Sequence, residues 1–277
     1  MAQALSSALP GFRRVEWVER TGSTNADLLA MIRDAGSTRL ARPWLLGAHL
    51  QDSGRGRAGR TWQNRAGANL MFSCAFDVFL PPAQLPALSL LAGVAVCRAL
   101  RSLMTPDGAE HLRMKWPNDI QWKWAKLAGI LVEVTRAGTT RMAADHYVAI
   151  IGIGVNLDDA RALSQSLNRQ VADWSEVAAT DAGAAQASAA DMVAAIATAW
   201  YDILGQAVRH GLDDLPQAYA DIDALAGQHI NVLHEGRIVQ AGVARGINSM
   251  GQLLVHTPDG PVPVSVGEVS VRPLVLS

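Results

Sequence analysis

The sequence predicts an α+β protein in which a large unit of mixed helices and strands precedes a small all-β unit. Three observations lead to this prediction. Residues 70–78 alternate between apolar and polar side chains, as a strand with one buried face does. Residues 87–104 are apolar nearly all round, which is typical of a buried helix. After Gly227, short β-rich runs are separated by turn signals about a dozen residues apart, as in a small barrel or sandwich.

Length and composition set the broad class. A chain of 277 residues fits about two domains of typical size, and the change after Gly227 divides them into residues 1–226 and 227–277. Apolar residues make up 49% and charged residues 18%, so the chain is not a disordered one. The net charge of −1 argues against a chain-wide surface for nucleic acid, although a local basic patch is compatible with it.

The sequence favours a cytoplasmic protein without a membrane partner. Two cysteines, Cys74 and Cys97, cannot build a disulfide framework, which fits a reducing compartment. The first ten residues carry no positive charge before a short apolar stretch, so they do not resemble a secretory signal. The longest uncharged stretch, residues 78–97, contains three prolines, which favours a loop leading into a buried helix over a membrane span.

The remaining elements follow from periodicity and capping signals. Further strands are expected at residues 15–18, 44–50, 112–116, 129–135 and 147–155. Ser23 or Thr24 can cap a helix that ends near Gly36. Residues 173–190 are expected to be a loop, because they are rich in small and polar residues.

A long helix is expected after that loop. Ser188 and Asp191 have capping-box spacing, and Gly211 fits the helix end. A short helix is expected within residues 215–225. Turns in the β-rich tail are expected at residues 235–236, 248–251 and 258–260.

The most unusual segment is a loop at residues 51–65 that is rich in glycine and arginine. Its Gly54-x-Gly56-x-x-Gly59 spacing matches the dinucleotide fingerprint, but residues 60–69 lack the helical periodicity that this fingerprint needs. Arginines interleave the glycines instead. Guanidinium groups suit carboxylate and phosphate, and glycines let the backbone approach a ligand. From spacing alone, an anion-binding loop and an ordinary surface loop are equally compatible with this segment.

Two further constellations could carry chemistry. Lys115-Trp116-Pro117-Asn118-Asp119 ends a strand in a turn, and Lys126 opens the next strand with Gly129 close behind it. A polar hairpin turn is the simpler alternative. Gly152 and Gly154 leave bare backbone on one face of a buried strand, where a flat ligand could lie; tight sheet packing or a bulge is the simpler alternative. The sequence contains no nucleophile elbow, Walker loop or zinc motif.

In this order, the motifs resemble those of the biotin protein ligases, which attach biotin to a carrier domain. The resemblance rests on residues 22–25, Gln51, and residues 54–62, 115–119, 126–133 and 152–156. A weaker likeness covers residues 230–272, including Ala244-Arg245-Gly246-Ile247 and Gly267-Glu268-Val269-Ser270. Together, the two parts of the resemblance imply a mixed sheet flanked by helices, like the core of class II aminoacyl-tRNA synthetases, and a C-terminal SH3-like barrel.

The resemblance also implies a two-step reaction with ATP, biotin and Mg²⁺. Biotin becomes biotinyl-5′-AMP, and a lysine of a biotin carboxyl carrier domain, from acetyl-CoA carboxylase or another biotin-dependent carboxylase, then takes the biotinyl group. The implied catalytic residues are Arg55, Arg57 and Lys126. The implied biotin-binding residues are Ser23, Thr24, Asn25, Gln51, Arg55, Gly56, Arg57, Lys126, Gly129 and Gly152. The implied ATP-binding residues are Arg57, Arg60, Trp62, Lys115, Asn118, Asn156 and Trp174. Asp119 is the implied metal ligand, although Asn118 and Asp119 could instead orient the acceptor lysine.

Several alternatives stay open. Some bacterial members carry an N-terminal helix-turn-helix and repress transcription, but here the motifs begin at Thr21, so we expect no DNA-binding role. A lipoate or octanoate ligase or transferase is the nearest rival, and the Gly-Arg-Gly-Arg loop with Gly129 favours biotin over it. A non-catalytic biotin sensor or nucleic-acid binder is a rival of another class. A homodimer is compatible with the sequence, which shows no seam for it.

Overall fold

The structure is a computed structural model that describes residues 1–34, 42–136, 145–266 and 269–273. Gly36, the expected helix end, and Gly267 and Glu268 of the C-terminal motif lie outside the described residues.

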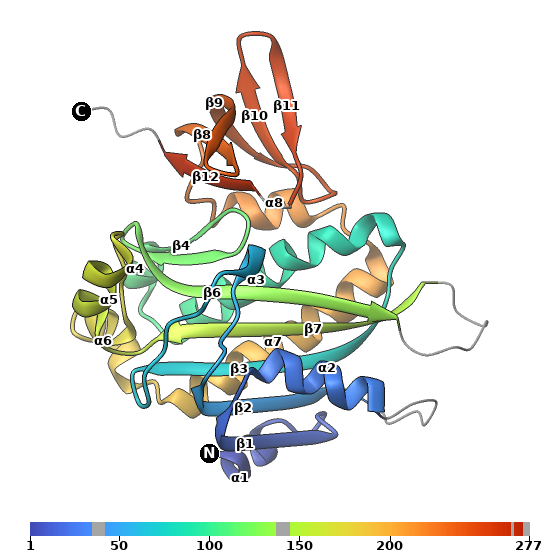
Figure 1. Cartoon of the computed structure of the whole chain (residues 1–277), viewed down its shortest axis with the longest axis vertical. Helices are drawn as coiled ribbons and strands as arrows, with labels where there is room; N and C mark the ends of the chain where they lie inside the picture. Colours follow the sequence, from blue (N-terminus) through green and yellow to red (C-terminus); the bar gives the residue numbers. More distant parts are fainter. Residues whose placement is uncertain (35–41, 137–144, 267–268, 274–277) are drawn as a thin grey trace.

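A mixed sheet forms the centre of the described part of the chain (Figure 1). Its seven strands are β1 (Arg14–Thr21), β2 (Trp44–Gln51), β3 (Asn69–Phe79), β4 (Leu112–Lys115), β5 (Asp119–Trp122), β6 (Ala125–Arg136) and β7 (His146–Asn156). Their order across the sheet is β1-β2-β3-β7-β6-β5-β4. The β1–β2 pair is parallel and the other neighbours are antiparallel, so the expectation of a mixed sheet is confirmed.

Helices cover both faces of this sheet. The helices of the described residues are α1 (Ala2–Ala8), α2 (Thr24–Asp34), α3 (Leu88–Arg101), α4 (Pro106–Ala109), α5 (Ala160–Leu167), α6 (Trp174–Ala178), α7 (Ala189–His210) and α8 (Leu215–Ala220), with short 3₁₀ turns η1 (Arg57–Gly59), η2 (Pro82–Ala87) and η3 (Ala184–Gln186). The main core lies between the sheet and α3 and α7, whereas α2 packs on the opposite face.

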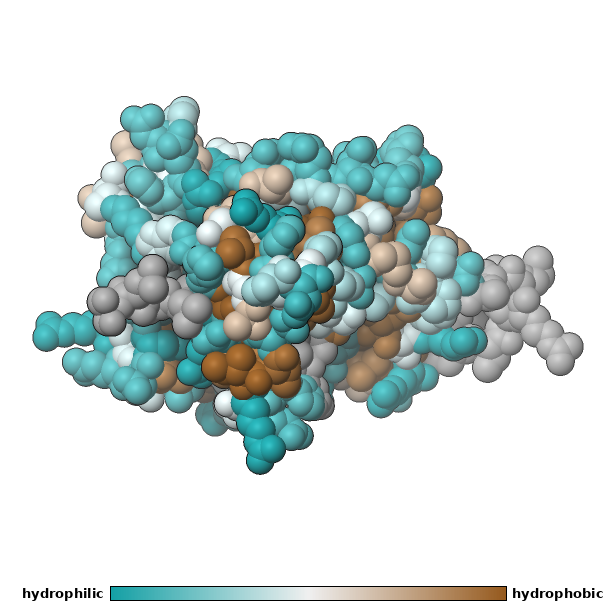
Figure 2. Space-filling view, turned by 90° about the horizontal axis from the view of Figure 1, so that it is seen from above, coloured by the Kyte–Doolittle hydropathy of each residue, from teal (hydrophilic) through white to brown (hydrophobic). Residues whose placement is uncertain are grey.

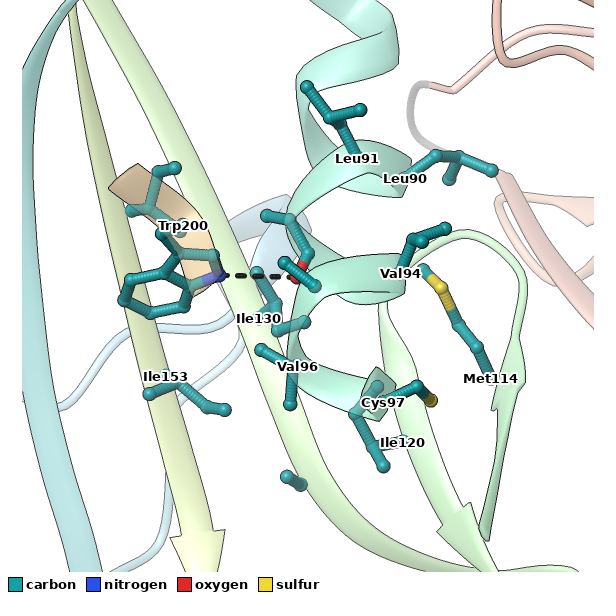
Figure 3. Close-up of a cluster of buried hydrophobic side chains, with 14 of the residues drawn as sticks. Leu90, Leu91, Val94, Val96, Cys97, Met114, Ile120, Ile130, Ile153 and Trp200 are labelled. Carbon is teal, nitrogen blue, oxygen red and sulfur yellow. Dashed lines mark hydrogen bonds between the residues drawn. The ribbon is translucent and has the colours of Figure 1, made fainter. Parts of the chain in front are cut away.

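The alternation within β3 explains how one strand serves both faces. Every second side chain belongs to the main core, and Ala75, which points the other way, belongs to the smaller cluster under α2. The core-facing residues are Leu70, Phe72, Cys74, Phe76 and Val78. Figure 3 shows Trp200 of α7 in that main core beside the apolar side chains of α3. The indole Nε1 of Trp200 donates to the carbonyl oxygen of Ala92 at 3.1 Å, which satisfies the one polar atom of this ring.

The most apolar helical stretch belongs to this core. Residues Pro82–Arg101 have the length and composition to cross a membrane, but 72% of the window is buried inside the fold. The expectation of a buried helix preceded by a proline-rich segment is therefore confirmed. Viewed from the side of the C-terminal strands, the surface is mostly hydrophilic, and its apolar residues occur in separate patches (Figure 2).

The structure departs from the sequence-based prediction at several places, and helices α1 and α4 and strand β5 are among the elements that were not predicted. Asp119 already belongs to β5 rather than to the preceding turn. Helix α5 has no predicted counterpart. Residues 173–190 are partly helical, because Asp173 and Glu176 form a capping box that starts α6. The capping box of Ser188 and Asp191 and the helix end at Gly211 are confirmed in α7.

The C-terminal residues form a second sheet of their own. Its strands are β8 (His229–His234), β9 (Arg237–Ile247), β10 (Leu253–Thr257), β11 (Gly260–Val264) and β12 (Val269–Pro273), in the order β11-β10-β9-β8-β12. All neighbours within it are antiparallel, and the three expected turns separate its first four strands. The SH3-like closure of this sheet and the division at residue 226 stay predictions.

Candidate active site

The glycine- and arginine-rich loop folds as a small hairpin, which we call the flap (residues 52–62). Arg55 pairs with Thr61 across the hairpin, and the N–H of Trp62 donates to the carbonyl of Gly54 at 2.8 Å. The turn η1 lies at its tip, where Ala58 and Gly59 have φ of 53° and 69°. The chain therefore turns back after Gly59 instead of entering a helix, which agrees with our rejection of the dinucleotide fingerprint.

Ion pairs and hydrogen bonds hold the flap over a cavity of about 540 Å³. At its base, Arg20 pairs with Asp52 with a closest N–O distance of 2.7 Å. Further along, Arg55 Nη1 lies 3.3 Å from Glu133 of β6. Residues 52–61 of the flap line the cavity on one side, and Leu131 and Glu133 of β6 line it on the other.

Three glycines leave the sheet bare beneath the flap. Gly129 of β6 and Gly154 of β7 are direct cross-strand partners. A Cβ at Gly154 would lie 2.3 Å from the Trp62 indole, and a Cβ at Gly129 would lie 3.1 Å from it. A Cβ at Gly152 would lie 2.2 Å from the Asn25 carboxamide oxygen. The glycines are thus required by close approach, and protein side chains occupy part of the flat surface that the sequence predicted.

A chain of hydrogen-bonded side chains runs along this surface from the start of α2. The carboxamide oxygen of Asn25 accepts from the Ser73 hydroxyl at 2.6 Å, and the Ser73 and Thr24 hydroxyl oxygens are also 2.6 Å apart. The backbone N–H of Thr24 donates to the Gln51 side-chain oxygen at 2.8 Å. Ser23, Thr24 and Asn25 are almost fully buried, and the polar atoms of Thr24 and Asn25 depend on these partners.

The other cations of the site gather around Asn118 and Asp119. Lys126 Nζ lies 2.5 Å from an Asp119 carboxylate oxygen and 5.7 Å from the centre of the Trp62 ring. Arg57 Nη1 donates to the Asn118 carboxamide oxygen at 3.3 Å. The structure thus brings Arg57 of the flap and Lys126 of β6 to the adjacent residues Asn118 and Asp119.

Burial shifts the pKa of two cations that lie near Asp119. It lowers the pKa of the Lys115 ammonium, against the opposing charge of Asp119, and nearby cations lower it further. It also lowers the pKa of Arg57, again with Asp119 opposing and Arg60 adding to the effect. The charged form of such a cation is stabilised when an anion binds beside it, so the surroundings of Asp119 favour a phosphate or carboxylate.

Comparison with known proteins decides the family. The model of the biotin/lipoate A/B protein ligase family matches residues 17–156, just over half of the chain. The chain belongs to this family. A second model, the biotin protein ligase C terminal domain, matches residues 226–272. These matches cover the flap, the glycine floor and the cations, together with the C-terminal sheet.

Named relatives agree with this family assignment. The biotin--[acetyl-CoA-carboxylase] ligase of Mycobacterium tuberculosis is 32% identical over 266 residues, covering 96% of this chain and 91% of that protein. The bifunctional ligase/repressor BirA of Escherichia coli is 31% identical over 225 residues, covering 81% of this chain but 65% of its own length. Among solved structures, the Aquifex aeolicus biotin protein ligase with biotin and ATP shares the fold at a TM-score of 0.70 and 23% identity, covering 94% and 99% of the two chains.

Two sequence-predicted site residues of this family member are engaged in internal contacts. The Asn156 amide donates to the carbonyl oxygens of Lys126 and Ala172, at 3.3 and 3.1 Å, and so ties β7 to neighbouring segments. Trp174 is buried at the start of α6, where its Nε1 donates to the Ala184 carbonyl at 3.2 Å. Their roles near the adenine stay predictions.

Other members of the site carried no role in the sequence analysis. Ser73 and Glu133 bond to Asn25, and Asn64 exchanges two hydrogen bonds with the backbone of Gln51 at the base of the flap. Arg272 of β12 is close enough to lower the Lys115 pKa. Ser73 had a sequence signal, because it lies opposite the apolar face of β3, but its partners follow only from the fold.

The donor set at Asp119 is compatible with magnesium that arrives with a nucleotide. Mg²⁺ is commonly held by one or two carboxylates together with substrate phosphates and water. Asp119 offers such a carboxylate beside the Asn118 carboxamide. No group of three or more His, Cys, Asp or Glu side chains among the described residues could hold a metal by itself.

Proposed function

We propose that this protein is an ATP-dependent ligase that activates biotin as biotinyl-5′-AMP and transfers the biotinyl group to a lysine of a biotin carboxyl carrier domain. The observation that carries the proposal is the flap, whose arginines line a cavity against β6 and whose Trp62 lies over Gly129 and Gly154 beside Lys126. The names of the relatives supply the substrate, since they act as biotin ligases for acetyl-CoA carboxylase.

The geometry suits a reaction between two anions. In the first step a carboxylate oxygen of biotin attacks the α-phosphorus of ATP, and pyrophosphate leaves. In the second step the carrier amine attacks the acyl carbon, and AMP leaves. Both steps require neutralised charge and in-line positioning rather than a covalent bond to the enzyme. Arg55, Arg57 and Lys126 supply the charge from two sides, and the flap keeps water away from the mixed anhydride.

The family resemblance supports the following roles for the polar residues. Ser23, Thr24, Asn25 and Gln51 meet the ureido ring, over the bare backbone at Gly129 and Gly152, while Gly56 lets the flap approach. Arg60, Trp62, Lys115 and Asn118, together with Asn156 and Trp174, serve the nucleotide. Asp119 either holds magnesium brought by ATP or orients the acceptor lysine.

The proposal extends to the setting in which the enzyme works. The carrier belongs to acetyl-CoA carboxylase or another biotin-dependent carboxylase, and the reaction takes place in the cytoplasm. Residues 1–226 form the catalytic domain, and residues 227–277 form an SH3-like domain. We expect no specific DNA binding, because the net charge is −1. A specific gel shift with operator DNA at low protein concentration would contradict this. The enzyme is compatible with a homodimer.

Mass spectrometry of a carrier domain tests the function directly. After incubation with this protein, ATP, Mg²⁺ and biotin, we expect one biotinyl group on one carrier lysine, and none when ATP is omitted or when that lysine is replaced by arginine. An unmodified carrier together with tight biotin binding would instead identify a sensor.

The lipoate and octanoate alternatives require a separate measurement. The rate of ATP–pyrophosphate exchange with biotin, lipoate or octanoate as the acid shows which acid is activated. We expect exchange with biotin. Faster exchange with either fatty acid would transfer the proposal to that substrate.

A further inference from the structure

Glu133 is an acidic side chain in a cavity that should receive anions. Among the residues that line this cavity, Asp52 is paired with Arg20 at the base of the flap. Glu133 instead joins the flap to the floor. One carboxylate oxygen lies 3.3 Å from Arg55 Nη1, and the other accepts from the Asn25 carboxamide nitrogen at 2.9 Å. An unpaired carboxylate here would repel anionic ligands. The contacts with Arg55 and Asn25 offset its charge and indicate a structural role.

The first consequence concerns the orientation of hydrogens along the floor. A carboxylate only accepts hydrogen bonds, so it holds the Asn25 nitrogen toward itself and leaves the Asn25 oxygen toward Ser73. Ser73 then donates its single hydroxyl hydrogen to the Asn25 oxygen. The Thr24 hydroxyl is then the remaining donor, and its acceptors are the Ser73 oxygen at 2.6 Å and the Gln51 side-chain oxygen at 3.2 Å.

The chain of donors ends at the groups that meet the ligand. Because the Thr24 hydrogen is used within this network, its hydroxyl oxygen is left as an acceptor. The Gln51 side-chain oxygen is held by the Thr24 backbone N–H, which leaves its nitrogen, 3.2 Å from the Met71 sulfur, as the donor. One acceptor and one donor side by side complement the N–H and C=O of a cyclic urea.

The second consequence concerns the flap. Arg55 is half exposed, and its pair with Glu133 crosses from the flap to β6. Arg57 of the flap is bonded to Asn118. The Glu133 contact therefore tethers the flap to the same network that orients Thr24 and Gln51.

We propose that Glu133 is a positioning residue that couples closure of the flap to the hydrogen-bond polarity of the biotin floor. The inference rests on the proposed function, because it assigns how the same site recognises its acid and retains its adenylate. Glu133 acts through Arg55 and Asn25 and forms no bond to the reacting atoms.

The test compares Glu133→Gln with Glu16→Gln in the full chain. The first substitution keeps the shape of the side chain but places an N–H₂ group against Arg55 or Asn25. Glu16 makes a matched control, because it pairs with Arg14 on β1 and does not line the cavity. For each variant, biotin-dependent ATP–pyrophosphate exchange gives KM and kcat, and a filter assay gives the release rate of preformed biotinyl-5′-AMP.

We expect Glu133→Gln to raise KM for biotin by about 10-fold, the effect of one lost charged hydrogen bond, and to speed release of the adenylate. KM for ATP and kcat at saturating biotin should stay close to those of Glu16→Gln. Equal biotin KM and equal release in the two variants would overturn the inference. Absence of exchange in the unsubstituted protein would instead overturn the proposed function.

A double-mutant cycle with Arg55→Ala separates the tether from a general loss of order. If Glu133 acts through Arg55, the double variant should release the adenylate no faster than the more affected single variant. Additive acceleration would contradict the coupling. Arg55 is exposed on the flap, so its substitution preserves folding. Even if Glu133→Gln failed to fold, unchanged release by Arg55→Ala would overturn the tether.

Discussion

At the scale of single residues, Gly129, Gly152 and Gly154 are needed because neighbouring side chains leave no room for a Cβ. Unusual backbone angles are not the reason. The sequence could predict bare backbone at Gly152 and Gly154, because their spacing puts them on one face of a strand. It could not predict that Asn25 and Trp62 approach that face, since both come from distant segments. For the same reason, the sequence could not predict that Ser73 and Glu133 belong to the site. Both bond to Asn25, which comes from a distant segment.

Gly154→Ala tests this close approach. The new Cβ would lie 2.3 Å from the Trp62 indole, so the ring must move away from its place beside Lys126. Overpacking of this kind typically costs ~1–3 kcal/mol of stability. We expect a lower midpoint of urea unfolding and slower pyrophosphate exchange. Gly11→Ala is the control, because nothing lies within 4 Å of its Cβ position. Identical exchange by the two variants would show that the position of Trp62 is irrelevant.

The cations make a second prediction at this scale. Arg57→Ala and Lys126→Ala each remove a positive charge from the surroundings of Asp119, which favour an anion. Loss of one such contact in a transition state typically slows a reaction by ~10²–10³-fold, so we expect that reduction in biotin-dependent pyrophosphate exchange. Arg98→Ala, an exposed arginine of α3, should leave exchange unchanged. Normal exchange in both active-site variants would contradict the assigned roles.

At the scale of elements, long apolar patterns were predictable and short polar ones were not. The strands β3 and β7 and the helices α3 and α7 carry enough apolar side chains to specify their faces. The flap pairs only Arg55 with Thr61 as a bridge, without apolar alternation, so the sequence could show a loop but not a hairpin. Helix α6 depends on one capping box, at Asp173 and Glu176, within a segment of small residues.

Limited proteolysis measures how strongly the flap is held. Contacts of Asp52 with Arg20, of Arg55 with Glu133 and of Arg57 with Asn118 join it to the fold, and its tip is exposed. We expect trypsin to cleave at residues 55–60 in the ligand-free protein and biotinyl-5′-AMP to slow this cleavage, because the ligand adds contacts to the arginines. Cleavage at an exposed arginine outside the flap, Arg161, should not change. Equal protection of the flap with and without ligand would contradict a closing flap.

At the scale of the whole molecule, the segment after α8 joins the two sheets. Asp223 forms a parallel bridge with Met114 at the edge of the large sheet, and the chain then enters the C-terminal strands. The Trp116 indole donates to the Gly251 carbonyl at 3.1 Å, which brings the C-terminal sheet against the Lys115–Asp119 motif. The sequence indicated a change of structure near Ala226, but no local pattern could show this contact between distant segments.

The junction itself contains a buried carboxylate, and this makes its stability depend on pH. Asp223 is 2% exposed. One of its oxygens accepts from the Tyr219 hydroxyl at 3.1 Å and the Leu225 N–H at 2.7 Å, and the other has no partner. Burial raises the Asp223 pKa above 3.8, although the Leu225 N–H, Tyr219 and the Arg113 charge oppose the shift. The protonated form is therefore favoured in the fold.

A raised carboxyl pKa contributes stability below the unfolded value, and this contribution is lost as the pH rises through the folded value. At neutral pH the Asp223 charge should thus oppose folding, and Asp223→Asn should remove this effect. Measured by urea unfolding, the stability of Asp223→Asn relative to the unsubstituted protein should increase from pH 4 toward pH 7. The exposed neighbour Asp221, replaced by Asn, should show no such trend. A difference in unfolding free energy between the two proteins that stays constant with pH would contradict this prediction. It would mean that Arg113 and the backbone N–H groups fully offset the effect of burial on the Asp223 carboxylate.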